Sequence, residues 1–203
     1  MKLLNKYEAL CFLILITTAL TLLSGCSSTQ SSDFYQLNEK VDPSLTGIEK
    51  GHVIGVGPIQ LPEYINRPQI VTRNSNHQMN ISEFHRWIEP LNDSISRVMV
   101  INLSNNLSSN RVYWVPRQDR QIPLNLRVVV DIGRFDGQLD ETVFFESRWS
   151  ILDNKNQPVL TRVTLIKVPV NGKTYEDLVV SMNKALQNLG IEISQSIKSI
   201  LTK

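Results

Sequence analysis

Residues 90–107, PLNDSISRVMVINLSNNL, carry the clearest folding signal in the sequence. The apolar residues recur at intervals of three or four positions, at Leu91, Ile95, Val98, Met99, Leu103 and Leu107. This spacing places them on one face of a helix, and a proline suits the first helical turn. The other face is polar, so the stretch predicts an amphipathic helix that packs one side against the rest of the protein.

Three extended segments are predicted ahead of this helix. Residues 53–59, VIGVGPI, are apolar on both faces, which is typical of a short buried strand. Residues 65–73 and 79–88 are further extended segments, with turn-forming residues between them. The first half of the chain is therefore predicted to form a strand-strand-strand-helix unit.

The second half repeats this order without visible sequence identity. Residues 124–132, 143–151 and 159–170 are predicted strands, and the glycine-flanked stretch 133–137, GRFDG, is expected to end the first of them. Thr174 with Asp177 three positions later predicts the start of a second helix. The helical stripe consists of Leu178, Met182, Ala185, Leu186, Leu189, Ile193 and Ile197, and the stripe could divide into two helices at Gly190.

Two such units predict a single α+β domain with a mostly antiparallel sheet and both amphipathic helices on one face. The whole chain has 203 residues, with 21 Lys and Arg against 19 Asp and Glu. This near balance gives no reason to expect nucleic acid or an anionic bilayer as a partner recognised by charge.

The amino terminus has the features of a lipoprotein signal peptide. Lys2 and Lys6 precede an apolar run at residues 9–23, which is shorter than the ~20 residues of a membrane-spanning helix. The run ends in LSGC at residues 23–26, which resembles the lipobox of bacterial lipoproteins. This resemblance implies that residues 1–25 are removed and that Cys26 is acylated. A secreted protein with a chance cysteine, or a residual membrane anchor, remains the alternative.

The residues after Cys26 indicate where the lipid-anchored chain is sorted. Ser27 follows the cysteine, whereas an aspartate there is the usual inner-membrane retention signal in enterobacteria, so the cell outer membrane is favoured. Residues 26–33 are small and polar and are predicted to form a flexible lipidated tether. Membrane contact is thus expected through the lipid anchor, which holds far more firmly than a single myristoyl chain.

The sequence offers no recognisable catalytic constellation. It has no G-x-S-x-G elbow, and its cysteines, Cys11 and Cys26, are assigned to the signal peptide and the lipid anchor. The G-x-G of Gly55 and Gly57 lacks the third glycine and the following helix of a phosphate-binding loop. We therefore expect no catalytic residue, no cofactor and no enzymatic activity.

A metal site is equally weakly indicated. His77 and His85 bracket Glu83, but the spacing matches no H-E-x-x-H or other ligand pattern. Solvated histidines are the expected outcome, and no metal ligand is predicted.

Residues 62–68, PEYINRP, interrupt what would otherwise be one long strand. Because proline cannot donate to a sheet ladder, the segment is predicted to be an edge or an exposed kink. An edge could accept a partner, and the alternative is a structural bend whose tyrosine covers the core. The candidate partner-binding residues are Pro62, Tyr64, Arg67, Arg73 and Trp87.

Several of these stretches match one family. VGPI at 56–59, LPEYINRPQIVTR at 61–73, RWIEPL at 86–91 and Arg97-Val98 closely resemble the PqiC-type (YmbA-type) lipoproteins of the ABC-type transport auxiliary lipoprotein family. The resemblance spans nearly all of the chain after the lipobox and implies an auxiliary lipoprotein domain over residues 34–203. It also implies an outer-membrane lipoprotein on the periplasmic face, with no catalytic residues to carry over.

The resemblance further implies partners, namely a periplasm-spanning protein with MCE domains and an integral inner-membrane subunit. The leading hypothesis is a lipoprotein that docks the MCE tube of an intermembrane lipid transport system and supports envelope integrity. A homo-oligomer is expected because a tube needs a matching opening. The alternative is a periplasmic lipid-binding carrier domain tethered to the outer membrane, which would need a deep apolar pocket.

Overall fold

The computed structural model describes residues 30–45, 51–116 and 123–202. The chain divides into two compact units, Met1–Ser31 and Ser32–Lys203. Only residues 30 and 31 of the first unit are described, so Cys26 and the predicted signal peptide lie outside the described residues. The fold concerns the second unit.

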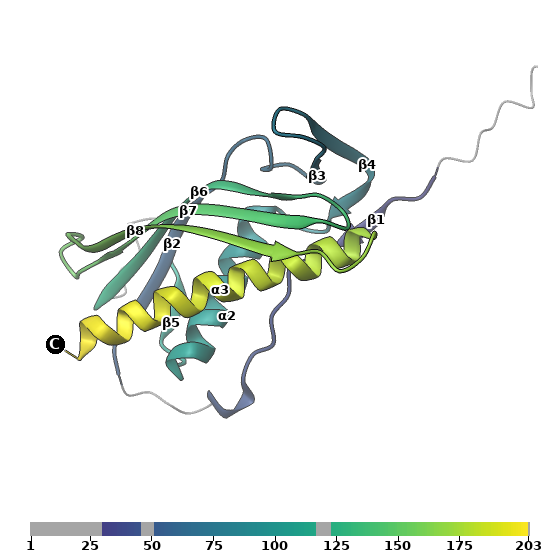
Figure 1. Ribbon diagram of the computed structural model, residues 1–203. Coiled ribbons are helices and arrows are strands. Elements are labelled where there is room, and N and C mark those ends of the chain that lie inside the picture. Colours follow the sequence, from purple (N-terminus) through teal and green to yellow (C-terminus); the bar gives the residue numbers. More distant parts are fainter. Residues whose placement is uncertain (1–29, 46–50, 117–122, 203) are drawn as a thin grey trace, which may run out of the picture. The chain divides into compact units, whose positions relative to one another are not determined.

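The elements of this unit follow the predicted order closely (Figure 1). They are β1 (Asp33–Tyr35), the 3-10 helix η1 (Pro43–Leu45), β2 (Ile54–Gln60), β3 (Gln69–Arg73), β4 (Met79–Trp87), α2 (Leu91–Leu107), β5 (Val112–Trp114), β6 (Leu126–Gly137), β7 (Thr142–Leu152), β8 (Pro158–Pro169) and α3 (Tyr175–Leu201). The short strands β1 and β5 were not predicted, because three residues are too few to show a pattern.

The strands form two sheets, a five-stranded one in the order β5-β2-β6-β7-β8 and a three-stranded one in the order β1-β4-β3. The long β6–β7 and β7–β8 ladders are antiparallel, as predicted. In contrast, β2 runs parallel to β5 and β6, and β1 runs parallel to β4. Helix α2 lies in the crossover between β2 and β5 that a parallel pair requires. The structure is therefore a single α+β domain with mixed sheets.

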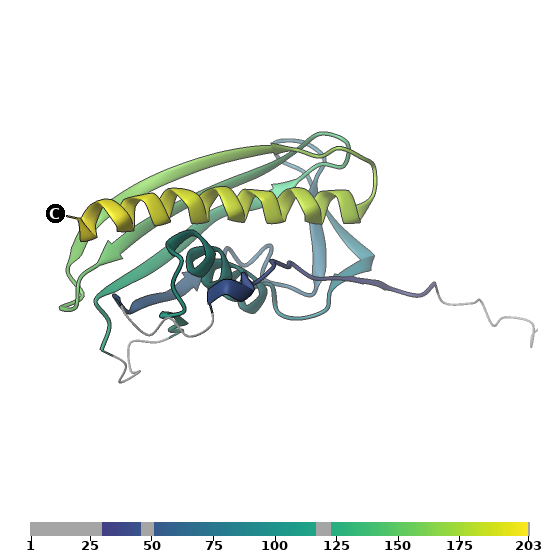
Figure 2. The ribbon, with the colours of Figure 1, turned by 90° about the horizontal axis from the view of Figure 1, so that it is seen from below.

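Both helices pack on one face of the five-stranded sheet, and α3 runs along its long strands (Figure 2). Alternate residues of β7 are buried on this inner face, namely Val143, Phe145, Ser147, Trp149 and Ile151. The helices meet them with fully buried side chains, among them Ile95, Met99, Leu103, Leu178, Leu186 and Ile193. This layer is the apolar core of the unit, and the predicted packing of both helices on one face is confirmed.

Strand β6 does not end at Ile132, and the prediction of a turn at residues 133–137 was wrong. The β6–β7 register shifts between Ile132 and Arg134, which marks a β-bulge. The extra residue returns Phe135 to the buried face that Ile132 occupies, although the two are three positions apart. The bulge therefore extends the strand and directs Asp136 to the outer face.

Helix α3 begins as predicted but does not divide at Gly190. Thr174 and Asp177 form a reciprocal capping box at its start. A Cβ atom at Gly190 would lie 2.9 Å from the Cβ of Asn102 on α2. The glycine thus serves the close approach of the two helices, and the buried stripe on either side of it keeps α3 continuous.

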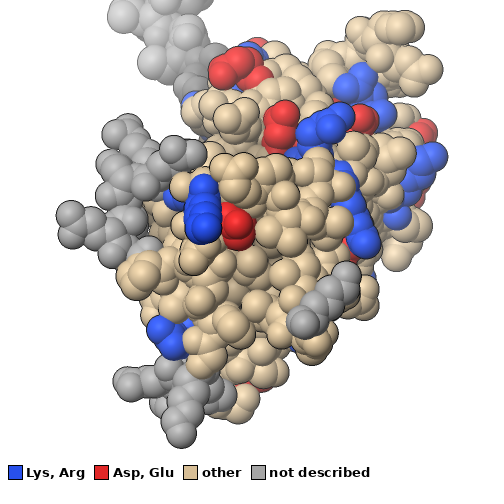
Figure 3. Space-filling model, turned by 90° about the vertical axis from the view of Figure 1, so that its left-hand side faces the viewer, with Lys and Arg blue, Asp and Glu red and all other residues tan. Residues whose placement is uncertain are grey.

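The charges on the face seen in Figure 3 are scattered. Lys, Arg, Asp and Glu atoms lie there among a mostly uncharged surface, and both signs occur (Figure 3). This face consequently presents no patch of a single sign.

Candidate functional site

The five candidate partner-binding residues are divided among a hydrogen-bonded cluster, a surface hollow and a turn. Tyr64 and Arg73 converge on Asp136, whereas Arg67 and Trp87 line a surface hollow. The carbonyl of Pro62 accepts hydrogen bonds from the backbone N–H groups of residues 65 and 66, at 3.1 and 3.3 Å. The segment is therefore a turned kink, and β3 begins at Gln69 instead of at residue 65.

The Asp136 cluster consists of Tyr64, Arg73, Arg134 and Asp136, and it joins the three-stranded sheet to the outer face of β6. The Asp136 side chain is fully buried, and the Tyr64 hydroxyl donates to its Oδ2 at 2.7 Å. Arg73 donates from Nε to Oδ1 at 2.9 Å and from Nη2 to Oδ2 at 3.0 Å, while Arg134 Nε donates to Oδ1 at 3.0 Å. Such forked, charge-assisted contacts fix the orientation of both partners.

Burial and these contacts act in opposite directions on the cluster's ionisation. Burial raises the pKa of the Asp136 carboxyl, but the hydrogen bonds from Arg73 and Tyr64 and the charge of Arg134 outweigh it and hold that pKa below its ordinary value. Burial, with the hydrogen bond to Asp136, raises the pKa of Tyr64 to about 12. Asp136 is thus an anion and Tyr64 a neutral donor at neutral pH, and the cluster joins the two sheets through charge-assisted hydrogen bonds.

The sequence did not single out Asp136 or Arg134, because both lie in the stretch that was expected to form a turn. Arg134 also places its guanidinium carbon 4.2 Å from the centre of the Phe144 ring. The apolar Phe135 between the charged Arg134 and Asp136 was the signal that the strand could continue past the bulge, with both charged residues on its other face.

The Arg67 hollow, of about 320 Å³, lies where the turn before β3 meets the end of β4 and the start of α2. It is lined by Asn66, Arg67, Pro68, Trp87, Ile88, Glu89, Pro90 and Leu91. The backbone N–H of Trp87 donates to the carbonyl of Pro68 at 2.7 Å, which ties two of its walls together. Trp87 is 6 % exposed, whereas Ile88 is 58 % exposed.

The carboxylate of Glu89 in this hollow already has its hydrogen-bond partners among neighbouring residues. Glu89 accepts hydrogen bonds from the Ser94 hydroxyl, from Arg97 Nη2 at 2.6 Å and from Gln36 Nε2 at 3.1 Å. These contacts, with that from Ser94 first, lower the pKa of Glu89 to about 2. Glu89 therefore remains an anion paired with Arg97 and does not serve as a partner for another cation.

Arg67 is the uncompensated charge of the hollow. Among the described residues its guanidinium makes no hydrogen bond or ion pair, and its Nε is buried without a hydrogen-bond acceptor. A buried donor without an acceptor is unfavourable. Arg67 as a whole is only half-buried, so the other nitrogens of its guanidinium can donate to an anionic oxygen in the hollow.

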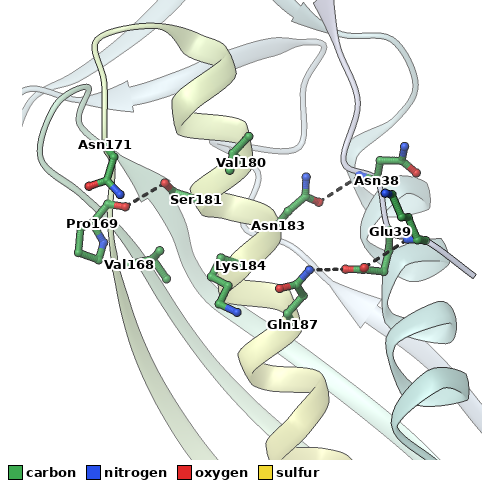
Figure 4. A pocket seen from close by; sticks show the side chains of 11 residues that line it. Asn38, Glu39, Val168, Pro169, Asn171, Val180, Ser181, Asn183, Lys184 and Gln187 are labelled. Carbon is green, nitrogen blue, oxygen red and sulfur yellow. Dashed lines mark hydrogen bonds between the residues drawn. The ribbon is translucent and has the colours of Figure 1, made fainter. Parts of the chain in front are cut away.

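A second hollow, of about 550 Å³, runs along the outside of α3 (Figure 4). The backbone N–H of Asn38 donates to Oδ1 of Asn183 at 3.0 Å, and Gln187 Nε2 donates to Glu39 Oε2 at 2.7 Å. The figure shows these contacts joining residues 38 and 39 to the helix. They attach the segment after β1 to the domain.

The three residues that were considered as weak metal ligands do not gather. In the part of the chain that the structure describes, no three His, Cys, Asp or Glu side chains are placed to hold a metal ion. The ring of His85 instead stacks on Tyr175, with centroids 3.8 Å apart, and its Nδ1 lies 2.8 Å from the Ser82 hydroxyl.

Among the described residues, no helix is both long enough and apolar enough to cross a membrane.

Fold and site together define an α+β protein whose described surface offers a charged hollow beside a rigid sheet joint. Comparison with known proteins gives the family. The chain belongs to the ABC-type transport auxiliary lipoprotein component family, whose model matches residues 35–194.

The relatives with assigned names are intermembrane transport lipoproteins. The chain is 26% identical over 188 residues to the intermembrane transport lipoprotein PqiC of Escherichia coli K12, which covers 92% of this chain and 97% of the relative. The lipoprotein of the same name from Shigella flexneri gives the same values. The expected resemblance to PqiC-type lipoproteins is confirmed.

Solved structures share the fold. One, of an uncharacterized protein, has a TM-score of 0.67 at 18% identity and covers 83% of this chain and 99% of its own. Another, from Xanthomonas campestris, has a TM-score of 0.61 at 16% identity and covers 80% and 93%. These likenesses support the α+β architecture.

Proposed function

We propose that this protein is an outer-membrane lipoprotein that docks the periplasmic end of an MCE-domain tube in an intermembrane lipid transport system. The observation that carries the proposal is the similarity to PqiC, which extends over nearly the whole of both chains. That similarity supports, at its coarsest, a lipoprotein component of an intermembrane transport system. Docking the tube at the outer membrane is how such a component would support envelope integrity.

In this proposal the chain has three parts. Residues 1–25 are the signal peptide, residues 26–33 form a tether acylated at Cys26, and residues 34–203 form the auxiliary domain on the periplasmic face of the outer membrane. The partners are the periplasm-spanning MCE protein and an integral inner-membrane subunit, and several copies of the domain would surround the tube opening.

The packing of the core favours a dock over the alternative, a lipid carrier. A carrier has to enclose acyl chains in an apolar cavity. Here the layer between helices and sheet is occupied by side chains with no exposed surface, such as Met99 and Leu186. The Arg67 hollow is small and lined by charged residues, which favours contacts on the surface of the domain.

The test compares the anchored chain with a form that lacks residues 1–26 and is exported by a cleavable signal peptide. For a dock, the anchorless form still binds the MCE protein in a pull-down but fails to restore envelope integrity, because the anchor fixes where the tube ends. Cys26→Ala should lose acyl labelling and fail likewise. Rescue by the anchorless form, together with one phospholipid per chain by mass spectrometry, would establish the carrier instead.

A further inference from the structure

We propose that the Arg67 hollow binds a carboxylate of an extended peptide segment in a protein partner, with an apolar side chain of that segment packed on Trp87 and Ile88. This inference rests on the proposed function in one respect, which is that the domain has a protein partner. It adds the place of contact and the chemistry that is recognised there.

The charge balance of the hollow is the first argument. The guanidinium of Arg67 has no acceptor among the described residues, and its Nε is buried. Glu89 does not compensate it, because Arg97, Ser94 and Gln36 already occupy that carboxylate. A carboxylate in the hollow would give Arg67 the forked pair of hydrogen bonds that guanidinium geometry favours.

The walls of the hollow are the second argument. Next to Arg67 stand Pro68, Trp87 and Ile88, and Ile88 is 58 % exposed although it is apolar. An anionic group next to an apolar side chain matches this combination, and Trp and Arg are among the residues that are enriched at protein interfaces.

The size of the hollow favours a peptide over a lipid. The volume of about 320 Å³ is at the lower end for ligand pockets and holds one or two side chains, not a pair of acyl chains.

The hollow is held in shape before a partner binds. Trp87 is fixed to Pro68 by a backbone hydrogen bond of 2.7 Å, and the N–H of Ile88 donates to the carbonyl of Tyr35 at 2.9 Å. A partner segment would therefore order itself against a rigid surface, which limits the entropy lost by the domain on binding.

The first experiment places a photo-crosslinking benzoylphenylalanine at Ile88 of the full acylated chain in living cells. We expect a cross-link to a protein segment in which an aspartate, a glutamate or the chain terminus lies within a few residues of the cross-linked position, identified by mass spectrometry of the digest. Arg67→Gln should lower the yield at least tenfold, Arg67→Lys should retain part of it, and the matched charge loss Arg148→Gln, on the exposed outer face of β7, should leave it unchanged.

The second experiment needs no variant, so it remains decisive even if Arg67→Gln folds poorly. The purified full chain in detergent is titrated with N-acetyl-Gly-Leu-Phe as the free acid and as the amide. The free acid should bind at least tenfold more tightly. Equal binding of the two probes, or no acid-specific binding, overturns the inference.

Other outcomes separate this inference from the proposed function. A cross-link to phospholipid, a yield indifferent to Arg67→Gln, or no cross-link while the MCE protein is still recovered in a pull-down overturns the peptide site and leaves the dock intact. Failure of the unsubstituted chain to recover any MCE protein would overturn the dock, while acid-specific peptide binding would still support the site.

Discussion

The two faces of the five-stranded sheet are covered by different chemistry. The inner face is filled by the apolar side chains of α2 and α3, whereas the outer face of β6 is joined to the three-stranded sheet through the Asp136 cluster. Two adjacent residues, Phe135 and Asp136, belong to one face each and are both buried. The inner contact is non-directional, and the outer one depends on the position of each donor. One strand thus supplies bulk stability on one side and alignment of the two sheets on the other.

The largest effect is expected on the apolar face. Phe135→Ala removes a ring that is 1 % exposed and packs edge-to-face on Phe145 with centroids 5.2 Å apart. We expect a loss of about 3–5 kcal/mol in the free energy of unfolding, measured by urea denaturation. A loss below about 1 kcal/mol, the size of an ordinary surface effect, would mean that this layer is not tightly packed.

The next effect tests the polar face of the same strand. Asp136→Asn leaves Arg73 and Arg134 without their anion, and we expect a loss of about 2–4 kcal/mol, since both arginines are partly exposed and can rehydrate. Asp131→Asn, at an exposed position on the same face of β6, is the control and should change stability by no more than about 0.5 kcal/mol. Equal losses for the two variants would contradict the role of the cluster as a joint.

A third substitution tests how closely the helices of the inner layer approach. Gly190→Ala puts a methyl group 2.9 Å from the Cβ of Asn102, so the helices must separate and about 1–3 kcal/mol should be lost. Gly133→Ala is the matched control, because the nearest atoms lie 4.0 Å from the added carbon. Calorimetry measures the change in melting temperature of both variants. An unchanged melting temperature for Gly190→Ala would show that the two helices can accommodate the methyl group where they cross.

The smallest expected effect is on the pH dependence of stability. It compares the partly exposed Glu89–Arg97 pair with the buried Asp136 cluster. The pKa of Glu89 is lowered to about 2, so its contribution to stability is present above the ordinary glutamate pKa and is lost as the pH falls from about 4.5 toward 2. Because its side chain is 30% exposed, we expect less than about 1 kcal/mol. Glu89→Gln should flatten this part of the stability curve, measured by denaturation at pH 6 and at about pH 3. An identical slope in both proteins would remove Glu89 as its source.

Features that depend on residues close together in the sequence could be predicted, whereas features that join residues far apart could not. Helix α2 spans Leu91–Leu107 as predicted, because its apolar spacing is a local property. The Asp136 cluster joins residues 63 and 72 positions apart, so no window of the sequence contains it. The same holds for the parallel pairing of β2 with β6, which depends on the whole crossover between them.

The candidate site could be predicted in part: its residues were identified from the sequence, but their arrangement was not. Composition singled out Arg67, because two prolines, an aromatic and an arginine are unusual in a strand, and Trp87 was named with it as a candidate partner-binding residue. Their shared hollow depends on the pairing of β3 with β4, which brings Pro68 beside Trp87. The unpaired state of Arg67 could not be predicted, since it depends on which neighbours Glu89 has already engaged.

Strand β1 also has a mechanical consequence. It pairs in parallel with β4, with Asp33, Phe34 and Tyr35 opposite His85, Arg86 and Trp87. A pull on the chain ahead of Asp33 along the strand axis would shear these contacts together instead of peeling them one at a time, which is the more resistant geometry. The last of these pairs ends at Trp87, so tension applied through a lipid anchor would be transmitted to the strand that forms one wall of the Arg67 hollow.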